Sequence, residues 1–228
     1  MRLTATLFLL MAAGLTAADN GRMTDAERKF LVDQLEQTKK TVLESIAGLT
    51  PAQWTFKAAP DRWSVQQCAE HIILAEGYIF GGSQKLLEMP AVPRPEKSNS
   101  TVDHMLVAQV TDRSKKLSAP EPLIPSGKFA TPEDAAKAFT EARDKSIAYA
   151  KTTDAELRVH VGPGPAGPMD AYQVLLLMAS HSARHTAQIR EVEADPNFPK
   201  ATARLLNTRE VSECNLSGFA VALIQAGL

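Results

Sequence analysis

The sequence predicts an all-α protein: a four-helix bundle with proline-rich connecting loops and a C-terminal extension. Three observations lead to this fold class. Four long segments begin with helix-capping residues and carry apolar side chains at helical spacing. No segment sustains the alternation of apolar and polar residues that is typical of strands. Ala, Leu, Glu, Lys and Gln, which favour helices, dominate the composition.

The size and composition fit one soluble globular domain. The chain has 228 residues, of which 44% are hydrophobic and 22% charged, and this apolar content excludes disorder along the whole length. Lys and Arg number 25 against 26 for Asp and Glu, so the net charge is −1 and no overall basic field favours nucleic acid. The two cysteines, Cys68 and Cys214, exclude a disulfide-rich scaffold and a four-thiolate zinc site.

Residues 1–18 have the layout of a secretory signal peptide. Arg2 gives a basic start, residues 3–15 are almost entirely apolar, and small residues precede a cleavage position after Ala18. We therefore expect export to the periplasm or the extracellular space, where the two cysteines could pair. The apolar run is too short for a comfortable membrane span, so no stable span is expected after processing. A buried N-terminal helix is the alternative.

Capping residues mark the helix starts. Thr24 and Ser64 open capping boxes, and Asp170 caps the last long helix. Prolines and glycines end the helices, and they predict loops at 90–95, 118–127 and 162–168. The predicted helices are 24–47, a short turn at 50–53, 64–88, 102–117, 131–152 and 170–193, and residues 157–161 alternate briefly and are expected to be extended. The predicted plan of the chain is a signal peptide (1–18), the bundle (19–196) and an extension (197–228) that packs on it.

The last long helix carries polar residues on the stripe that faces other helices. Buried imidazoles cost free energy unless each finds a partner. At i, i+4 spacing, His181 and His185 project from one face of the helix, one turn apart. This is the geometry with which a helix gives two ligands to one metal ion. The stripe consists of Val174, Met178, His181, His185, Gln188 and Val192.

A third imidazole belongs to the second long helix. The neighbours of His71 at helical spacing are mostly core-like, so it is expected to face inward, and facing helices of a bundle place such side chains in one central cavity. Three neutral imidazoles with one open position are typical of a catalytic metal site. Nitrogen ligands suit zinc, nickel, iron or copper and do not suit calcium or magnesium. The alternative is that all three are ordinary core histidines bonded to carbonyl groups.

Two stretches of the chain resemble a known family. Residues 63–71 (WSVQQCAEH) are similar to the first motif of the DinB-like superfamily, metalloenzymes related to bacillithiol and mycothiol S-transferases, and residues 181–189 (HSARHTAQI) are similar to its second motif. The resemblance covers roughly residues 23–193. It implies a four-helix bundle and a metal ion held by His71, His181 and His185. It implies no single reaction.

The motif composition limits the chemistry. Ser182 stands where the zincin pattern H-E-x-x-H has its general base, so this is not a zincin. Glu70 points about 100° around the helix from His71. It is therefore expected to be solvated or to contact a metal-binding residue without reaching the metal itself. The lack of a carboxylate on the stripe favours a cosubstrate that brings its own nucleophile, such as a thiolate. We therefore expect a metal-dependent hydrolase or thiol transferase with zinc or nickel ahead of iron. The alternatives are a non-catalytic metal-containing binding or stress-related protein, and a bundle whose histidines bind nothing.

Several other residues have expected positions relative to the site. Gln188, one turn beyond His185, and Tyr78, two turns from His71, are candidates to contact the substrate or the ligands. Cys68 is expected to be a small buried core residue, and Arg184 is expected at the surface or near the cavity mouth. The expected partner is a small molecule of unknown identity and not nucleic acid. The sequence leaves the choice between a monomer and a homodimer open.

Overall fold

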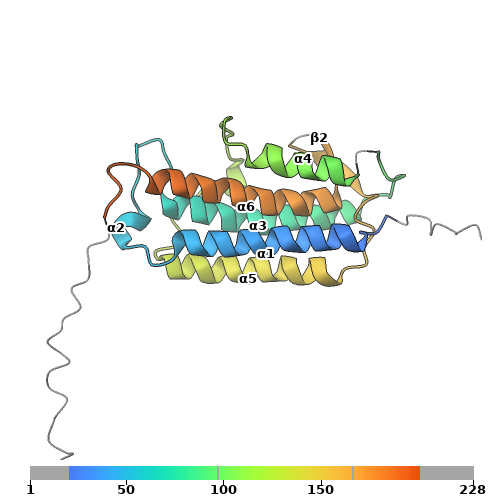
Figure 1. The fold of residues 1–228 in the computed structure, drawn as a ribbon, viewed down its shortest axis with the longest axis horizontal. Coiled ribbons are helices and arrows are strands. Elements are labelled where there is room, and N and C mark those ends of the chain that lie inside the picture. The colour runs from blue at the N-terminus through green and yellow to red at the C-terminus, as the bar shows by residue number, and fades with distance from the viewer. Residues whose placement is uncertain (1–20, 97, 166, 201–228) are drawn as a thin grey trace, which may run out of the picture.

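Four long helices form the body of the protein (Figure 1). The computed structural model describes residues 21–96, 98–165 and 167–200. The long helices are α1 (Asp25–Ile46), α3 (Val65–Leu87), α5 (Pro132–Thr152) and α6 (Ala171–Glu193). Both α5 and α6 pack against α1 and α3, so α5 and α6 face each other diagonally across the core. The predicted fold class, an all-α four-helix bundle, is confirmed.

The helices begin where the capping residues predict. The side chains of Thr24, Ser64 and Asp170 each accept a hydrogen bond from the backbone N–H three residues on, and the side chain at that position bonds back to the cap. Each such cap stabilises a helix by about 1 kcal/mol. Because the start of α3 and the start of α6 are both fixed in this way, the positions of their histidines along each helix are fixed as well.

Short helices and a β-hairpin lie around the four long helices. The helix α4 (Ser100–Thr111) packs on α6, and the one-turn helix α2 (Pro51–Trp54) lies at one end of the bundle (Figure 1). At the opposite end, β1 (Val161–Gly164) and β2 (Gly167–Asp170) form an antiparallel hairpin (Figure 1). The 3-10 turn η1 (Glu121–Leu123) contacts α3. Among the described residues, no helix is long and apolar enough to cross a membrane.

Three predictions about these short elements are wrong. The helix expected over 102–117 runs from 100 to 111, because the Asp112 carboxylate accepts from the backbone N–H and hydroxyl of Ser114 and turns the chain away. The loop expected over 162–168 is the hairpin, and of the segment 157–161 only Val161 is in a strand. Gly162 lets this hairpin close on α3, since a Cβ at that position would lie 2.4 Å from the side chain of Leu86.

The apolar core consists of two clusters separated by polar residues. We call the first the hairpin-end cluster and the second the α2-end cluster. Between them, each long helix contributes one buried polar side chain to what we call the polar layer: Thr38, Glu76, Arg143 and Ser182. The hairpin-end cluster includes Leu31, Leu35, Ile79, Leu86, Ile147, Leu175 and Leu176. The α2-end cluster includes Val42, Ile46, Trp54, Val65, Ile72, Phe139 and Ile189.

Arg143 joins the four helices within the polar layer. Its guanidinium lies 2.5 and 2.8 Å from the two carboxylate oxygens of Glu76 on α3. It also donates to the hydroxyl of Ser182 on α6 at 2.8 Å and to the hydroxyl of Thr38 on α1 at 2.6 Å. Because Arg143 is 0% exposed and Glu76 is 1% exposed, this ion pair is desolvated as well as hydrogen-bonded.

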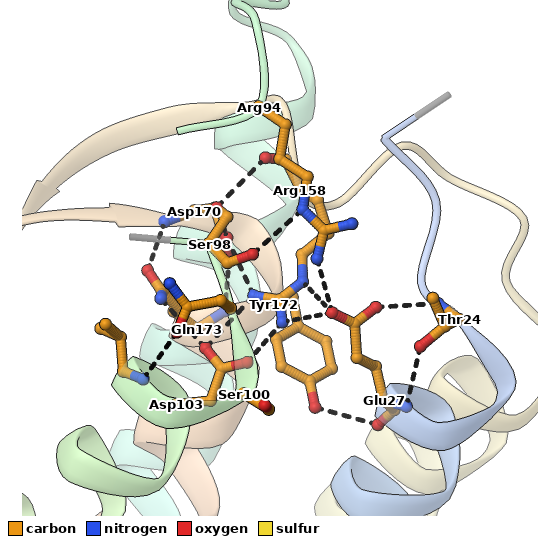
Figure 2. Close-up of polar contacts among 12 residues, drawn as sticks. Thr24, Glu27, Arg94, Ser98, Ser100, Asp103, Arg158, Asp170, Tyr172 and Gln173 are labelled. Atoms are coloured by element: carbon orange, nitrogen blue, oxygen red, sulfur yellow. Dashed lines mark hydrogen bonds and ion pairs between the residues drawn. The ribbon is translucent and has the colours of Figure 1, made fainter. Parts of the chain in front are cut away.

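A second buried arginine lies near the hairpin (Figure 2). Arg158 is 0% exposed and contacts three carboxylates from different segments, those of Glu27 on α1, Asp103 on α4 and Asp170 at the start of α6. Its guanidinium also lies 3.8 Å from the centre of the Tyr172 ring. We call these five residues the Arg158 network. It ties α1, α4 and α6 together at the hairpin end.

Acid is expected to weaken the Arg158 network through Glu27. Burial alone would raise the pKa of Glu27, but hydrogen bonds from Arg158 and Thr24, with the nearby arginine charges, hold it below its ordinary value of 4.5. A carboxyl group with a lowered folded-state pKa stabilises the fold above its unfolded pKa, and this contribution is lost as the pH falls through the folded pKa. In urea titrations, the free energy of unfolding should therefore decrease below about pH 4.5. Glu27→Gln should be less stable at neutral pH and should lose less stability on acidification; an equal loss would contradict this origin.

Some predictions fall on residues outside the described part. These are the signal peptide at 1–18, Cys214 and nearly all of the extension at 197–228. Of the extension, residues 197–200 are described: the ring of Phe198 packs edge-on against Phe56 at 5.4 Å, and the Pro199 carbonyl accepts from Gln53 on α2. Cys68 is buried as expected, and burial raises the pKa of its thiol to about 12.

Candidate metal centre

Three imidazoles meet in the core between α3 and α6. One nitrogen from each of His71, His181 and His185 lies within 4.8 Å of the other two. The Nε2 atoms of His71 and His181 are 3.0 Å apart. His71 is 3% exposed, His185 is 9% exposed and His181 is half-buried. Within the described residues, no other group of three or more histidine, cysteine or acidic side chains comes together in this way.

The local structure explains the convergence. His181 and His185 are one turn apart on α6, so their rings project from the same face, and this face packs against α3. His71 lies on the opposing face of α3. The Trp63 ring, just before α3, covers the cluster on one side, with its centre 4.8 Å from that of His71 and 6.2 Å from that of His185. The imidazoles therefore have an apolar wall on that side.

Two of the rings are oriented by partners on their outer nitrogen. His71 Nδ1 lies 2.7 Å from the carbonyl oxygen of Leu123 in η1, and His185 Nδ1 lies 2.8 Å from Oε1 of Gln188. Both partners only accept hydrogen bonds at these atoms, so we assign the proton to Nδ1 in each ring. The Nε2 atom of each ring then presents a lone pair. Such outer hydrogen bonds fix the ring orientation of metal-binding histidines.

Gln188 is itself held in place. Its Oε1 also accepts from Nη1 of Arg113 at 3.3 Å, and Arg113 pairs with both carboxylate oxygens of Glu191 at 2.6 and 2.7 Å. The structure thus places Gln188 in contact with His185. Arg113 was missed from the sequence, because it follows α4 and is 75 residues from Gln188 along the chain.

All three rings are neutral near physiological pH. Burial, followed by the neighbouring imidazoles, lowers the pKa of His185 to about 2, and burial, followed by the His71 ring, lowers that of His181 to about 3. Burial also lowers the pKa of His71, opposed by the Leu123 carbonyl. Neutral imidazoles keep the lone pairs that a metal ion requires.

The cluster fits a transition-metal cation. One N–H···N hydrogen bond between His71 and His181 can satisfy a single pair of nitrogens, whereas a cation among the rings would be bound by all three lone pairs. Nδ1 of His181 is buried, and the described part of the chain offers it no hydrogen-bond partner. A set of three neutral nitrogen donors suits zinc, nickel, iron or copper rather than calcium or magnesium.

Tyr78 and Arg184 have other surroundings than the sequence predicts. Tyr78 is 57% exposed, so it lies at the surface of α3 rather than in the core. Arg184, expected at the surface or near the cavity mouth, is 7% exposed and donates to the carbonyl groups of Val110, Asp112 and Lys115, which helps to end α4.

Glu70 is neither solvated nor pointed at a ligand. It is 1% exposed, and its carboxylate accepts four hydrogen bonds from Ser126, Gly127 and Lys128. Burial alone would raise its pKa, but these hydrogen bonds outweigh burial and lower the pKa. The solvated position expected from its helical angle is wrong because a distant loop covers it.

Comparison with known proteins places the chain in a family. The family model described as "DinB superfamily" matches residues 34–189. The chain belongs to the DinB superfamily. This DinB superfamily member also resembles the solved structure of YfiT from Bacillus subtilis, described as a probable metal-dependent hydrolase with an unusual four-helix bundle topology. The match has a TM-score of 0.51 and 16% sequence identity, and it covers 75% of this chain and 88% of that one. At this identity the similarity shows a shared fold. No curated protein matches the sequence.

Proposed function

We propose that this DinB superfamily member is a metal-dependent hydrolase or transferase. His71, His181 and His185 would hold one divalent transition metal ion, with zinc or nickel favoured over iron. The observation that carries the proposal is the convergence of three neutral ring nitrogens within 4.8 Å of one another in the core. The description of YfiT as a probable metal-dependent hydrolase agrees with it.

Residues of the chain would bind the metal ion, orient the imidazole rings and shield the site from water. Leu123 and Gln188 fix two of the rings through their Nδ1 protons, and Trp63 excludes water on one side. With three protein ligands, a tetrahedral site keeps one position for a substrate or solvent molecule. A metal ion bound there supplies Lewis acidity and lowers the pKa of a bound water or thiol.

The carboxylates around the rings favour a substrate that brings its own nucleophile. Glu70 is occupied by four hydrogen bonds, Glu76 by Arg143 and Glu191 by Arg113. A general base must reach the proton that it removes, and these three are engaged elsewhere. We therefore propose transfer to a small-molecule thiol ahead of hydrolysis. We further infer that the protein acts after export, on the basis of the signal peptide that the sequence predicts over residues 1–18.

His185→Ala is expected to abolish metal binding. After reconstitution with zinc or nickel, elemental analysis of the wild type should give about one metal ion per chain. His185→Ala should bind little metal and should lose the increase in melting temperature that metal gives the wild type, because binding to the folded state alone stabilises it. His104→Ala is the matched control, since this histidine is exposed and stacks on Phe30. Full occupancy in His185→Ala would refute the ligand assignment.

A catalytic and a non-catalytic metal site can be told apart by ligand access. In the cobalt-substituted wild type, added azide or a small thiol should change the visible spectrum, because a catalytic site keeps an exchangeable position. Turnover of an electrophile with a thiol, but not with water, would support transfer. A spectrum that no added ligand changes would favour the metal-containing binding protein instead.

A further inference from the structure

We propose that Glu70 is a positioning residue for the metal centre: it holds the segment 121–128 so that the Leu123 carbonyl orients His71. The inference rests on the proposed function where it concerns metal affinity. Glu70 and His71 are consecutive on α3, but they point in different directions, and each bonds to the same loop. Glu70 binds the end of the loop at 126–128, and His71 binds its beginning at Leu123.

All four hydrogen bonds to Glu70 come from donors, so they require an acceptor at both side-chain oxygens, as a carboxylate provides. Oε1 accepts from the backbone N–H of Ser126 at 2.9 Å and from its hydroxyl at 3.0 Å. Oε2 accepts from the backbone N–H of Gly127 at 2.7 Å and of Lys128 at 2.9 Å. Gly127 has φ +86°, a conformation that favours glycine and that aims consecutive N–H groups at one anion. An amide in place of the carboxylate would set an NH₂ group against these donors.

The first turn of the segment has two anchors of its own, the Leu123 side chain in the hairpin-end cluster and the bond from the Leu123 N–H to the Pro120 carbonyl. The side chain of Leu123 is buried, but Glu121, Pro122, Ile124, Ser126, Gly127 and Lys128 are exposed. Further along, the Phe129 carbonyl is held by both Trp54 and Gln66, at 3.1 and 2.7 Å. Those bonds hold the chain beyond the loop, whereas the Glu70 contacts lie between them and Leu123. Glu70 therefore holds the segment after Leu123 against α3, and together with the anchors of Leu123 itself it sets where the Leu123 carbonyl points.

Two measurements test this role. In the metal-free protein, exchange of the His71 Nδ1 proton with water is followed by NMR, and the His185 Nδ1 proton bonded to Gln188 serves as an internal reference. Glu70→Gln should accelerate exchange at His71 by about tenfold or more and leave His185 unchanged. In zinc titrations it should weaken affinity by up to about tenfold, the lower end of the cost of losing an outer partner of a ligand, because the Leu123 carbonyl is displaced and not removed.

Matched variants separate positioning from general loosening. Gly127→Ala disturbs the same turn from the exposed side of the loop, without touching the bundle core, and should change both measurements in the same direction. Gln66→Ala removes another bond to this part of the chain but leaves Phe129 bonded to Trp54, so it should behave as wild type.

The outcomes distinguish this inference from the proposed function. Wild-type exchange and wild-type zinc affinity in both Glu70→Gln and Gly127→Ala would overturn the role of Glu70. Equal losses in Gln66→Ala would also overturn it, because the effect would then be general. If the wild type itself binds no zinc, the proposed function fails, while proton exchange at His71 still decides whether Glu70 positions the ring.

Discussion

Arg158→Met should destabilise the protein by about 5 kcal/mol, because removing one partner of a buried ion pair costs about 3–5 kcal/mol and Arg158 serves three carboxylates. The three are Glu27, Asp103 and Asp170, and the last two are almost completely buried. Methionine can replace the aliphatic part of the side chain, but it donates no hydrogen bond. The carboxylates would then remain in the core with their charges unpaired, or would have to take up protons.

The matched control for Arg158 is Arg94→Met. Arg94 also pairs with Glu27, at 2.6 Å, but its side chain is 22% exposed. An ion pair that water can reach contributes about 0–1 kcal/mol, so this variant should be only slightly less stable than wild type. Urea unfolding followed by circular dichroism gives both values. Similar losses in the two variants would contradict the role assigned to burial of Arg158.

Arg143→Met should be the second most damaging of these substitutions, with an expected loss of about 3–5 kcal/mol. It would leave the Glu76 carboxylate, 1% exposed, without its cation. It would also remove the bond to Ser182 on the diagonal helix α6 and the bond to Thr38 on the neighbouring helix α1. Unlike Arg158, Arg143 pairs with one carboxylate among the described residues. The stability lost by Arg143→Met can therefore be recovered by a second substitution at that one carboxylate.

The compensating variant is the double substitution Arg143→Met with Glu76→Leu. Replacing a buried ion pair by apolar residues of similar volume is often neutral, so the double variant should recover most of the stability lost by Arg143→Met. The difference between the double variant and the sum of the single variants measures the coupling of the two residues. A double variant whose loss equals the sum of both single losses would show that the charges are not coupled.

The helix starts and the shared face of two histidines in the candidate site could be predicted because their signals are local. A cap such as Ser64 or Asp170 and its partner lie three residues apart, so their meaning does not depend on the rest of the fold. The spacing of His181 and His185 likewise fixes their shared face. The position of His71 opposite them could be predicted once a bundle was assumed, because facing stripes of a bundle share one core.

The polar interior could not be predicted, because its partners are far apart in sequence. Arg143 and Glu76 are 67 residues apart, and Arg158 and Glu27 are 131 residues apart. A buried arginine has the same local pattern as a surface arginine. For Glu70 the helical angle correctly directed the side chain away from His71, but no local signal placed the loop 126–128 over it. The hairpin at 161–170 was missed because its glycines and prolines are typical of loops.

The polar layer has a consequence for how an ion would enter and leave. It separates the apolar contacts into two clusters, and His71 and His185 lie on its α2-end side. Proteins open in cooperative units that are often smaller than the whole domain. If the α2-end half opens as one such unit while the hairpin-end half stays closed, the imidazoles become accessible without global denaturation. The residence time of a bound ion would then follow the opening free energy of one half of the molecule, not the stability of the entire chain.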